Sequence, residues 1–94
     1  MILYKEEISE LRKEINRLNV EILEKLVERV EIARKIGAVK KRHGFPIING
    51  VREAEIFQQI RKLSKEQNLN PIKVERIFRE IVRLCTEVEL EDEG

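Results

Sequence analysis

Several kinds of chemistry are excluded by residues that this chain lacks or nearly lacks. Its 94 residues include one Cys, one His and no Trp. The lone Cys85 excludes an intrachain disulfide and fits a reducing compartment. The lone His43 counts against a Ser-His or Cys-His nucleophile pair, and no cluster of His and Cys has the spacing of a metal site. A Gly-rich phosphate loop is also missing. We therefore expect no metal ion.

The chain also lacks the signals of membrane and nucleic-acid partners. No apolar run reaches about 18 residues and no signal peptide is visible, so we expect a soluble, cytoplasmic protein with no membrane partner. Basic and acidic residues nearly balance, 19 against 18, so no net field attracts nucleic acid. The basic cluster 40–43 is short and has no interleaved aromatic residue, as is usual for the solvated end of a helix.

Charge is what the chain has in abundance. Charged residues make up 39% of the sequence, and they recur at i,i+3 and i,i+4 spacings. This pattern indicates surface ion-pair networks of the kind enriched in thermophilic proteins. The length predicts a single domain over 1–94.

A first helix of unusual length is predicted in the N-terminal half. No Pro or Gly precedes Gly37, and apolar residues keep a helical period from about Ile8 to Lys40. We expect one helix over about 5–42, which at ~1.5 Å per residue is more than ~50 Å long. Gly37 lies inside this helix, where it is unfavourable but lets another backbone or a ligand come close.

Two shorter helices follow the long one. Gly and Pro within 43–46 end the long helix, and Asn49 is a suitable N-cap for a second helix over about 50–68. An Asn-Pro pair begins a third helix over about 71–90, and the acidic tail 91–94 is expected to fray. The predicted fold class is therefore all-α, with one long and two shorter helices per chain.

The unequal helix lengths predict a dimer. Each shorter helix is about half as long as the first and covers only part of its apolar face. A monomer would expose several turns of Leu and Ile, which soluble monomers avoid. Two chains laid side by side would cover this surface, and a site along their shared core would draw residues from both. A plain coiled coil is the alternative, but the stripe breaks heptad spacing and Arg29 would begin its second run.

Two cations interrupt the apolar stripe of the long helix. At about 100° per residue the stripe fills a wedge roughly 80° wide, with Arg29 and Lys40 inside it and Arg12 at its edge. A buried cation costs several kcal/mol unless an anion meets it, so a buried polyanionic ligand is one explanation. Snorkelling of the cations to solvent and an internal Glu partner are the alternatives. The stripe consists of Ile8, Leu11, Ile15, Leu18, Ile22, Leu26, Ala33 and Ile36.

Other polar residues fall where a site is conceivable. Arg52 and Glu53 occupy the first turn of the second helix, next to Asn49, although a Glu is favoured there by the helix dipole alone. Glu89 lies at the edge of the apolar face of the third helix, beside Cys85. Taken singly, Glu89 has the features of a terminal solvated residue and Cys85 those of a small core residue.

Five elements of the sequence form a specific set when taken in order. They are Leu11-Arg12-Lys13-Glu14-Ile15, Arg29 within Val27-Glu28-Arg29, Lys40 eleven residues later, Arg52-Glu53 twelve residues after that, and Arg76-Ile77-Phe78 with the segment to Glu89. This set resembles the all-α chorismate mutase family in its stand-alone, monofunctional form. The likeness covers roughly residues 6–90 and leaves no room for a dehydratase, dehydrogenase or regulatory domain.

The resemblance implies an isomerase that converts chorismate to prephenate on the shikimate pathway, towards phenylalanine and tyrosine. It also implies an intertwined helical homodimer with two equivalent sites. The reaction is an intramolecular Claisen rearrangement, which needs no nucleophile, metal or cofactor. The enzyme has to hold the enolpyruvyl side chain over the ring. It also has to stabilise negative charge that grows on the ether oxygen.

The resemblance assigns roles to individual residues. Arg29 of one chain and Arg12 of the partner chain would grip the substrate carboxylates, and Lys40 would reach the ether oxygen and a carboxylate. Glu53 would accept from the ring hydroxyl with help from the backbone of Asn49. The remaining roles are support by Arg52, a second donor to the ether oxygen at Glu89, and a substrate contact at Cys85.

Three of these positions depart from the family pattern. Asn49 stands where relatives often carry Asp, and a backbone contact survives that change. Cys85 stands where a relative can have Ser, which weakens any hydroxyl contact. Glu89 replaces a Gln, and because a carboxylate cannot donate a hydrogen bond, Glu89 has to be protonated to act as a donor.

Two other functions remain open at this point. A lyase on the same fold that removes pyruvate from isochorismate would require the same cations for its anionic substrate. A non-catalytic helical dimer acting as an interaction module would make these charged residues ordinary surface residues, and truncating Arg29 would then be harmless.

Overall fold

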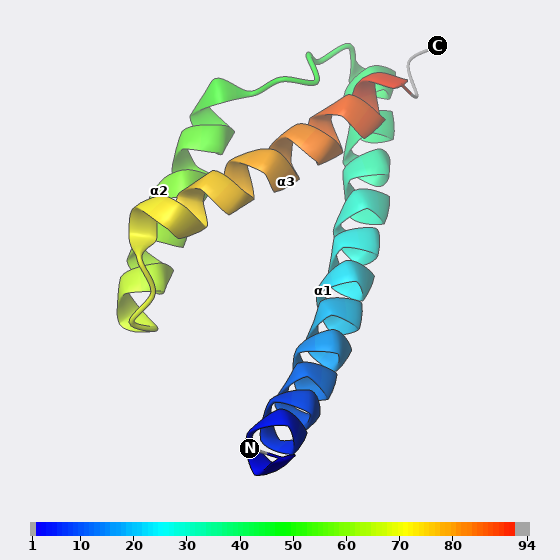
Figure 1. Cartoon of the computed structure of the whole chain (residues 1–94). Helices are drawn as coiled ribbons and strands as arrows, with labels where there is room; N and C mark the ends of the chain where they lie inside the picture. The colour runs from blue at the N-terminus through cyan, green and yellow to red at the C-terminus, as the bar shows by residue number, and fades with distance from the viewer. Residues whose placement is uncertain (1, 92–94) are drawn as a thin grey trace.

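The computed structural model describes residues 2–91, with only the backbone of Ile2, and over this range it consists of three α-helices without strands (Figure 1). The long helix α1 spans Ile2–His43, and the two shorter helices are α2, Gly50–Glu66, and α3, Pro71–Glu91. The predicted all-α architecture of one long and two shorter helices is confirmed. In this part of the chain no helix combines the length and apolar character needed to cross a membrane.

Helix α3 holds the chain together. It packs along α2 in a hairpin and then crosses the C-terminal half of α1 (Figure 1). Ala33 and Gly37 are buried on α1 at this crossing, and Cys85 and Val88 are buried on α3. The small methyl of Ala33 and the absence of a side chain at Gly37 let the two helices approach closely. The C-terminal half of α1 therefore forms one wall of the structure, and α2 forms the other.

The N-terminal half of α1 has no partner within the chain. It extends away from the other two helices (Figure 1), and the molecule measures 63 × 28 × 14 Å. Leu11 and Ile22, both members of the apolar stripe, are 56% and 59% exposed. Among the described residues no large side chain is fully buried, so the core of a single chain is thin.

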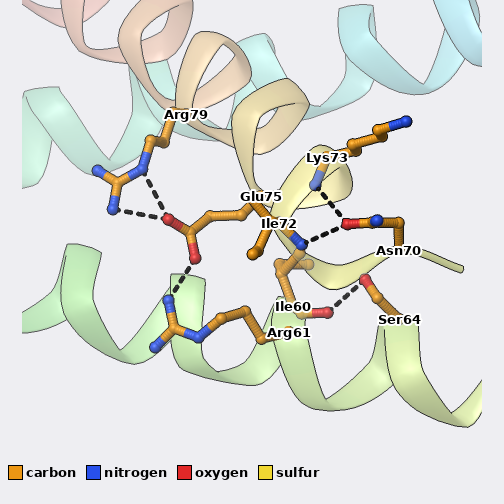
Figure 2. Close-up of polar contacts among 8 residues, drawn as sticks. All are labelled: Ile60, Arg61, Ser64, Asn70, Ile72, Lys73, Glu75 and Arg79. Atoms are coloured by element: carbon orange, nitrogen blue, oxygen red, sulfur yellow. Dashed lines mark hydrogen bonds and ion pairs between the residues drawn. The ribbon is translucent and has the colours of Figure 1, made fainter.

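The caps of the two shorter helices explain where they begin and end. Asn49 has extended backbone angles, and its Oδ1 accepts from the backbone N–H of Arg52 at 3.1 Å. Asn70 caps α3 in the same way, with its Oδ1 3.1 Å from the backbone nitrogens of both Ile72 and Lys73 (Figure 2). Both N-caps lie where the sequence places them.

The end of α2 differs from the prediction. The helix stops at Glu66, two residues before the expected end at 68, because Asn68 adopts a left-handed conformation with φ of 59°. The backbone N–H of Leu69 then donates to the Ser64 carbonyl at 2.9 Å, and that of Asn68 donates to the Lys65 carbonyl at 3.1 Å. These two bonds make a Schellman cap, which an Asn can supply in place of Gly. Helices α2 and α3 begin at the predicted residues, whereas both ends of α1 and the end of α3 shift by one to three residues. Residues 92–94 of the expected fraying tail lie outside the described range.

An ionic cluster joins α2 to α3. The Glu75 carboxylate accepts from Arg61 on α2, and its Oε2 accepts from Nε of Arg79 at 2.9 Å (Figure 2). The Arg79 guanidinium also lies over the ring of Phe57, 4.2 Å from its centroid. Hydrogen bonds from Arg61 and then Arg79 hold the pKa of Glu75 below its ordinary value of 4.5. Glu75 therefore links the two helices of the hairpin in its ionised form.

Protonation of Glu75 should weaken the hairpin. Because its pKa is lowered on folding, its stabilising contribution is present above the ordinary pKa and is lost as pH falls through the folded value. We expect Glu75→Gln to lower the melting temperature at neutral pH, and this difference should shrink in acid. Thermal melts at one protein concentration across the acid range would measure the effect. Glu80→Gln is the matched control, because Glu80 pairs with Arg83 on the exposed face of α3. Equal effects of the two changes would contradict the special role of Glu75.

Surface ion pairs along the helices follow the predicted spacings. Examples are Lys13 with Glu10 and Arg17 with Glu21, each at 2.9 Å and both well exposed. Each such pair contributes at most about 1 kcal/mol. The pairs support the individual helices but do not determine how the helices pack.

Candidate active site

A cavity of about 250 Å³ lies where α1, the start of α2 and the last turns of α3 meet. Seven of the eight residues predicted for the site line this cavity, and the eighth, Arg12, does not. The seven are Arg29, Lys40, Asn49, Arg52, Glu53, Cys85 and Glu89. Residues separated by up to 60 positions in sequence are thus brought together on one surface.

The two cations on α1 reach the cavity because of their spacing. Eleven residues are about three helical turns, so Arg29 and Lys40 lie on the same side of α1, roughly 16 Å apart along its axis. Both are partly buried. The helix that predicts their common orientation is continuous through both positions.

Arg29 is oriented by Cys85. Its Nη1 donates to Sγ of Cys85 at 2.8 Å, and Cys85 is buried with 5% exposure. A thiol sulfur is only a weak acceptor, so this contact directs the guanidinium without neutralising it. Cys85 therefore contacts one of the two cations of the cavity directly.

Lys40 is oriented by the loop between α1 and α2. Its Nζ donates to the backbone carbonyl of Ile47 at 2.6 Å, and Ile47 is itself buried. An ammonium has three donors, so this bond leaves two for other acceptors. Among residues 2–91 no carboxylate forms an ion pair with Lys40 or Arg29. The described part of the chain therefore offers these two cations no Glu in a direct ion pair.

Glu89 places a carboxyl group in the same cavity. Its side chain is partly buried, and burial raises its pKa above the ordinary value of 4.5, while attraction to Lys40 and then Arg29 acts in the opposite direction. Burial has the larger effect, so Glu89 holds its proton to higher pH than an exposed Glu. Such a group can serve as a hydrogen-bond donor, which an ionised carboxylate cannot.

The N-terminus of α2 supplies the other polar residues. The carbonyl of Asn49 accepts from the backbone N–H of Glu53 at 3.0 Å, which places Glu53 on the first turn beside the cavity. Arg52 also lines the cavity, but its Nη1 lies 3.5 Å from Oε2 of Glu55 in an exposed pair. The geometry therefore gives Arg52 a more peripheral position than Arg29 or Lys40. Across the described chain no three His, Cys, Asp or Glu side chains converge as metal ligands.

Residues 11–90 match the family described as chorismate mutase type II. The chain belongs to the type II chorismate mutase family. The bifunctional chorismate mutase/prephenate dehydratase of Aquifex aeolicus is 42% identical over 87 residues, covering 89% of this chain and 24% of that protein. The chorismate mutase of Methanocaldococcus jannaschii is 37% identical over 65 residues, covering 69% of this chain and 66% of that protein. The T-protein of Enterobacter agglomerans is 31% identical over 77 residues, covering 82% of this chain and 21% of that protein. The chain thus spans from about a fifth to about two thirds of these three relatives.

Within a single chain of this chorismate mutase family member, Arg12 does not reach the cavity, unlike the other seven predicted site residues. It is exposed on the unpartnered half of α1, in a separate depression with Tyr4 and Ile8. Seventeen residues of helix place it roughly 25 Å from Arg29 along the axis. The rigid rod of α1 prevents Arg12 from bending back into its own cavity.

Sequence reasoning missed the apolar walls of this chorismate mutase-type cavity and one hydroxyl. Ile36 belongs to the helical stripe and could have been assigned from it. Ile47 is a loop residue outside any periodic pattern, and Thr86 is visible only once α3 is placed against α2. The missed lining residues are Ile32, Ala33, Ile36, Ile47, Ile56, Val82 and Thr86.

Proposed function

We propose that the chain catalyses the rearrangement of chorismate to prephenate in aromatic amino acid biosynthesis. One observation carries this proposal: the cavity contains two cations, Arg29 and Lys40, and neither forms a direct ion pair with a carboxylate of the described chain. Chorismate brings two carboxylates, so a dianion of this size suits the site. Family membership and the names of the relatives support the same reaction.

The reaction requires the protein to supply position and charge. One C–O bond breaks and one C–C bond forms within a single molecule, so no proton, electron or co-reactant enters the balance. Fixing the reactive conformer is worth up to about 7–11 kcal/mol in favourable cases. A well-placed donor to the developing oxyanion adds about 2.7–4 kcal/mol.

Arg29 and Lys40 have the central roles in this proposal. The guanidinium of Arg29, directed by Cys85, binds one substrate carboxylate through two parallel N–H bonds. Lys40, anchored on the Ile47 carbonyl, uses its remaining donors for the ether oxygen and a carboxylate. Glu53 accepts from the ring hydroxyl beside the Asn49 backbone, and Arg52 supports this end of the cavity.

Glu89 is proposed as the second donor to the ether oxygen, which predicts a pH dependence. Only its protonated form donates, so kcat/KM should fall as pH rises through the pKa of Glu89, which burial places above its ordinary value. Glu89→Gln supplies a donor at every pH and should flatten this limb. Glu87→Gln, an exposed neighbour on α3, is the control and should keep the wild-type profile. Superimposable profiles of wild type and Glu89→Gln would remove Glu89 from the catalytic set.

We also propose that the active form is an intertwined homodimer with two sites. The uncovered apolar half of α1 supports this proposal, because a second copy would supply the missing packing. An antiparallel arrangement would carry Arg12 of one chain towards the cavity of the other. We expect light scattering across a dilution series to give two chains that separate only on unfolding. A folded monomer at micromolar concentration would contradict both the dimer and the shared site.

The proposed activity is tested by mixing purified protein with chorismate and following substrate loss and prephenate appearance. A parallel reaction with isochorismate, monitored for pyruvate, tests the lyase alternative. Rapid prephenate formation without pyruvate release is the expected result. A folded protein that leaves chorismate unchanged over its spontaneous rate would exclude the proposed function.

A further inference from the structure

Gly37 of α1 lies directly against Glu89 of α3, which supplies the three atoms nearest to the position of a Cβ at Gly37. A Cβ atom added at Gly37 would lie 3.1 Å from Cγ of Glu89 and 3.3 Å from its Cβ. Both distances are shorter than ordinary van der Waals contact, so an alanine here would require Glu89 to move. The second Gly of a helix, Gly50 at the start of α2, has open space around the same added atom. The tight contact is therefore particular to Gly37 and not a general property of the glycines.

The position of Gly37 in α1 relates this contact to the cations. Gly37 is one helical turn before Lys40, on the same side of α1, and it follows the buried Ala33 by four residues. Apart from Pro, Gly is the least favourable residue for a helix interior, so helix formation alone would favour another residue here. The missing side chain instead makes room for the stem of Glu89 against the helix.

We propose that Gly37 is a positioning residue for Glu89: by leaving space on α1, it lets the Glu89 stem lie against the helix and holds the carboxyl at the wall of the cavity. This inference rests on the proposed function, since the donor role of Glu89 is part of that proposal. Gly37 touches no substrate and acts only through Glu89.

The charged groups around Glu89 determine what displacement would do. From α1 it faces Arg29 and Lys40, and from α2 the cavity adds Arg52 and Glu53. A methyl at Gly37 pushes the Glu89 side chain away from α1 and towards water, which relieves the burial that raises its pKa. The same move weakens the attraction to Lys40 and Arg29, but this effect is smaller than that of burial. Displacement should therefore lower the pKa of Glu89.

The experiment compares Gly37→Ala with wild type and with the matched control Gly50→Ala. Carbon-13 NMR of labelled Glu side chains would follow the titration of the Glu89 carboxyl, and kcat/KM would be measured over the same pH range. We expect the Glu89 titration to move to lower pH in Gly37→Ala only. A shift of one pH unit lowers the protonated fraction, and with it kcat/KM, about tenfold at pH above both pKa values.

Combination with Glu89→Gln separates this inference from the proposed function. In the Gln background Gly37→Ala should leave kcat/KM independent of pH, because an amide donates at every pH. An unchanged Glu89 titration in Gly37→Ala would overturn the positioning role. A shifted titration with pH-independent kcat/KM in every protein would support positioning by Gly37 and refute the catalytic role of Glu89.

A second variant covers the case in which Gly37→Ala does not fold. Glu89→Gly removes both the Cγ and the Cβ atom that the added methyl would meet and leaves only Cα at 3.7 Å, an ordinary contact. The double variant Gly37→Ala with Glu89→Gly should therefore recover the helical structure of Glu89→Gly alone by circular dichroism. Recovery would support a steric contact between the two positions. Failure to recover would place the conflict elsewhere in the helix crossing and overturn the inference.

Discussion

Replacing Arg29 or Lys40 by Ala is expected to lower kcat/KM by at least about 100-fold, the loss typical of one oxyanion donor. Each cation lines the cavity without a direct ion pair to a carboxylate of the described chain, so each is available to the substrate. Steady-state kinetics with chorismate would measure the loss. Lys62→Ala, an exposed cation on α2 away from the cavity, is the control and should retain activity. Near-wild-type activity of Arg29→Ala would favour a non-catalytic interaction module.

The same two variants should differ in stability. Arg29→Ala removes a partly buried charge whose only described partner is a weak thiol acceptor, so folding should be unaffected or improved. Lys40→Ala also removes the bond to the Ile47 carbonyl, and an unsatisfied buried carbonyl costs about 1–3 kcal/mol. Thermal melts should therefore rank Arg29→Ala above Lys40→Ala. The loss of activity in Arg29→Ala would then not be attributable to unfolding.

Mixing inactive Arg12→Ala chains with inactive Arg29→Ala chains should restore activity. In a two-fold dimer half of the randomly exchanged dimers are mixed, and each has one intact site of two, so recovery should approach about a quarter of wild type. The reason is that Arg12 lies too far along α1 to reach its own cavity. Activity after verified subunit exchange is the measurement.

A second mixture controls for this complementation. Arg29 and Lys40 line the same cavity of one chain, so mixing Arg29→Ala with Lys40→Ala chains leaves every site damaged. No recovery is expected there. If the Arg12 mixture also fails to recover after exchange, Arg12 acts within its own chain or outside any site.

The sequence predicts those parts of the fold and site that depend on local periodicity. Arg29 and Lys40 could be assigned to one face because a continuous helix fixes the direction of every side chain along it. The Asn49 cap and the start of α3 follow from local hydrogen bonding in the same way. The end of α2 was missed because an Asn in the left-handed conformation gives no unique sequence signal.

Contacts between distant elements could not be predicted. The bond from Arg29 to Cys85 joins residues 56 apart, and nothing near either residue encodes it. Ile47 lines the site only because the loop between α1 and α2 brings its carbonyl to Nζ of Lys40. The fit of Gly37 against Glu89 likewise depends on the crossing of α1 and α3. Arg12 shows a further limit, since its proposed contacts lie on another chain.

Because α3 contacts both α2 and the C-terminal half of α1, it links two helices that otherwise stand apart, and this affects the order in which the chain folds. The α2–α3 hairpin is built from contacts close in sequence, which form quickly, whereas docking of α1 closes a long loop and comes late. The cavity therefore exists only after this last step. A ligand that binds there stabilises an interaction missing from earlier stages, so it should slow unfolding while leaving the rate of hairpin formation unchanged.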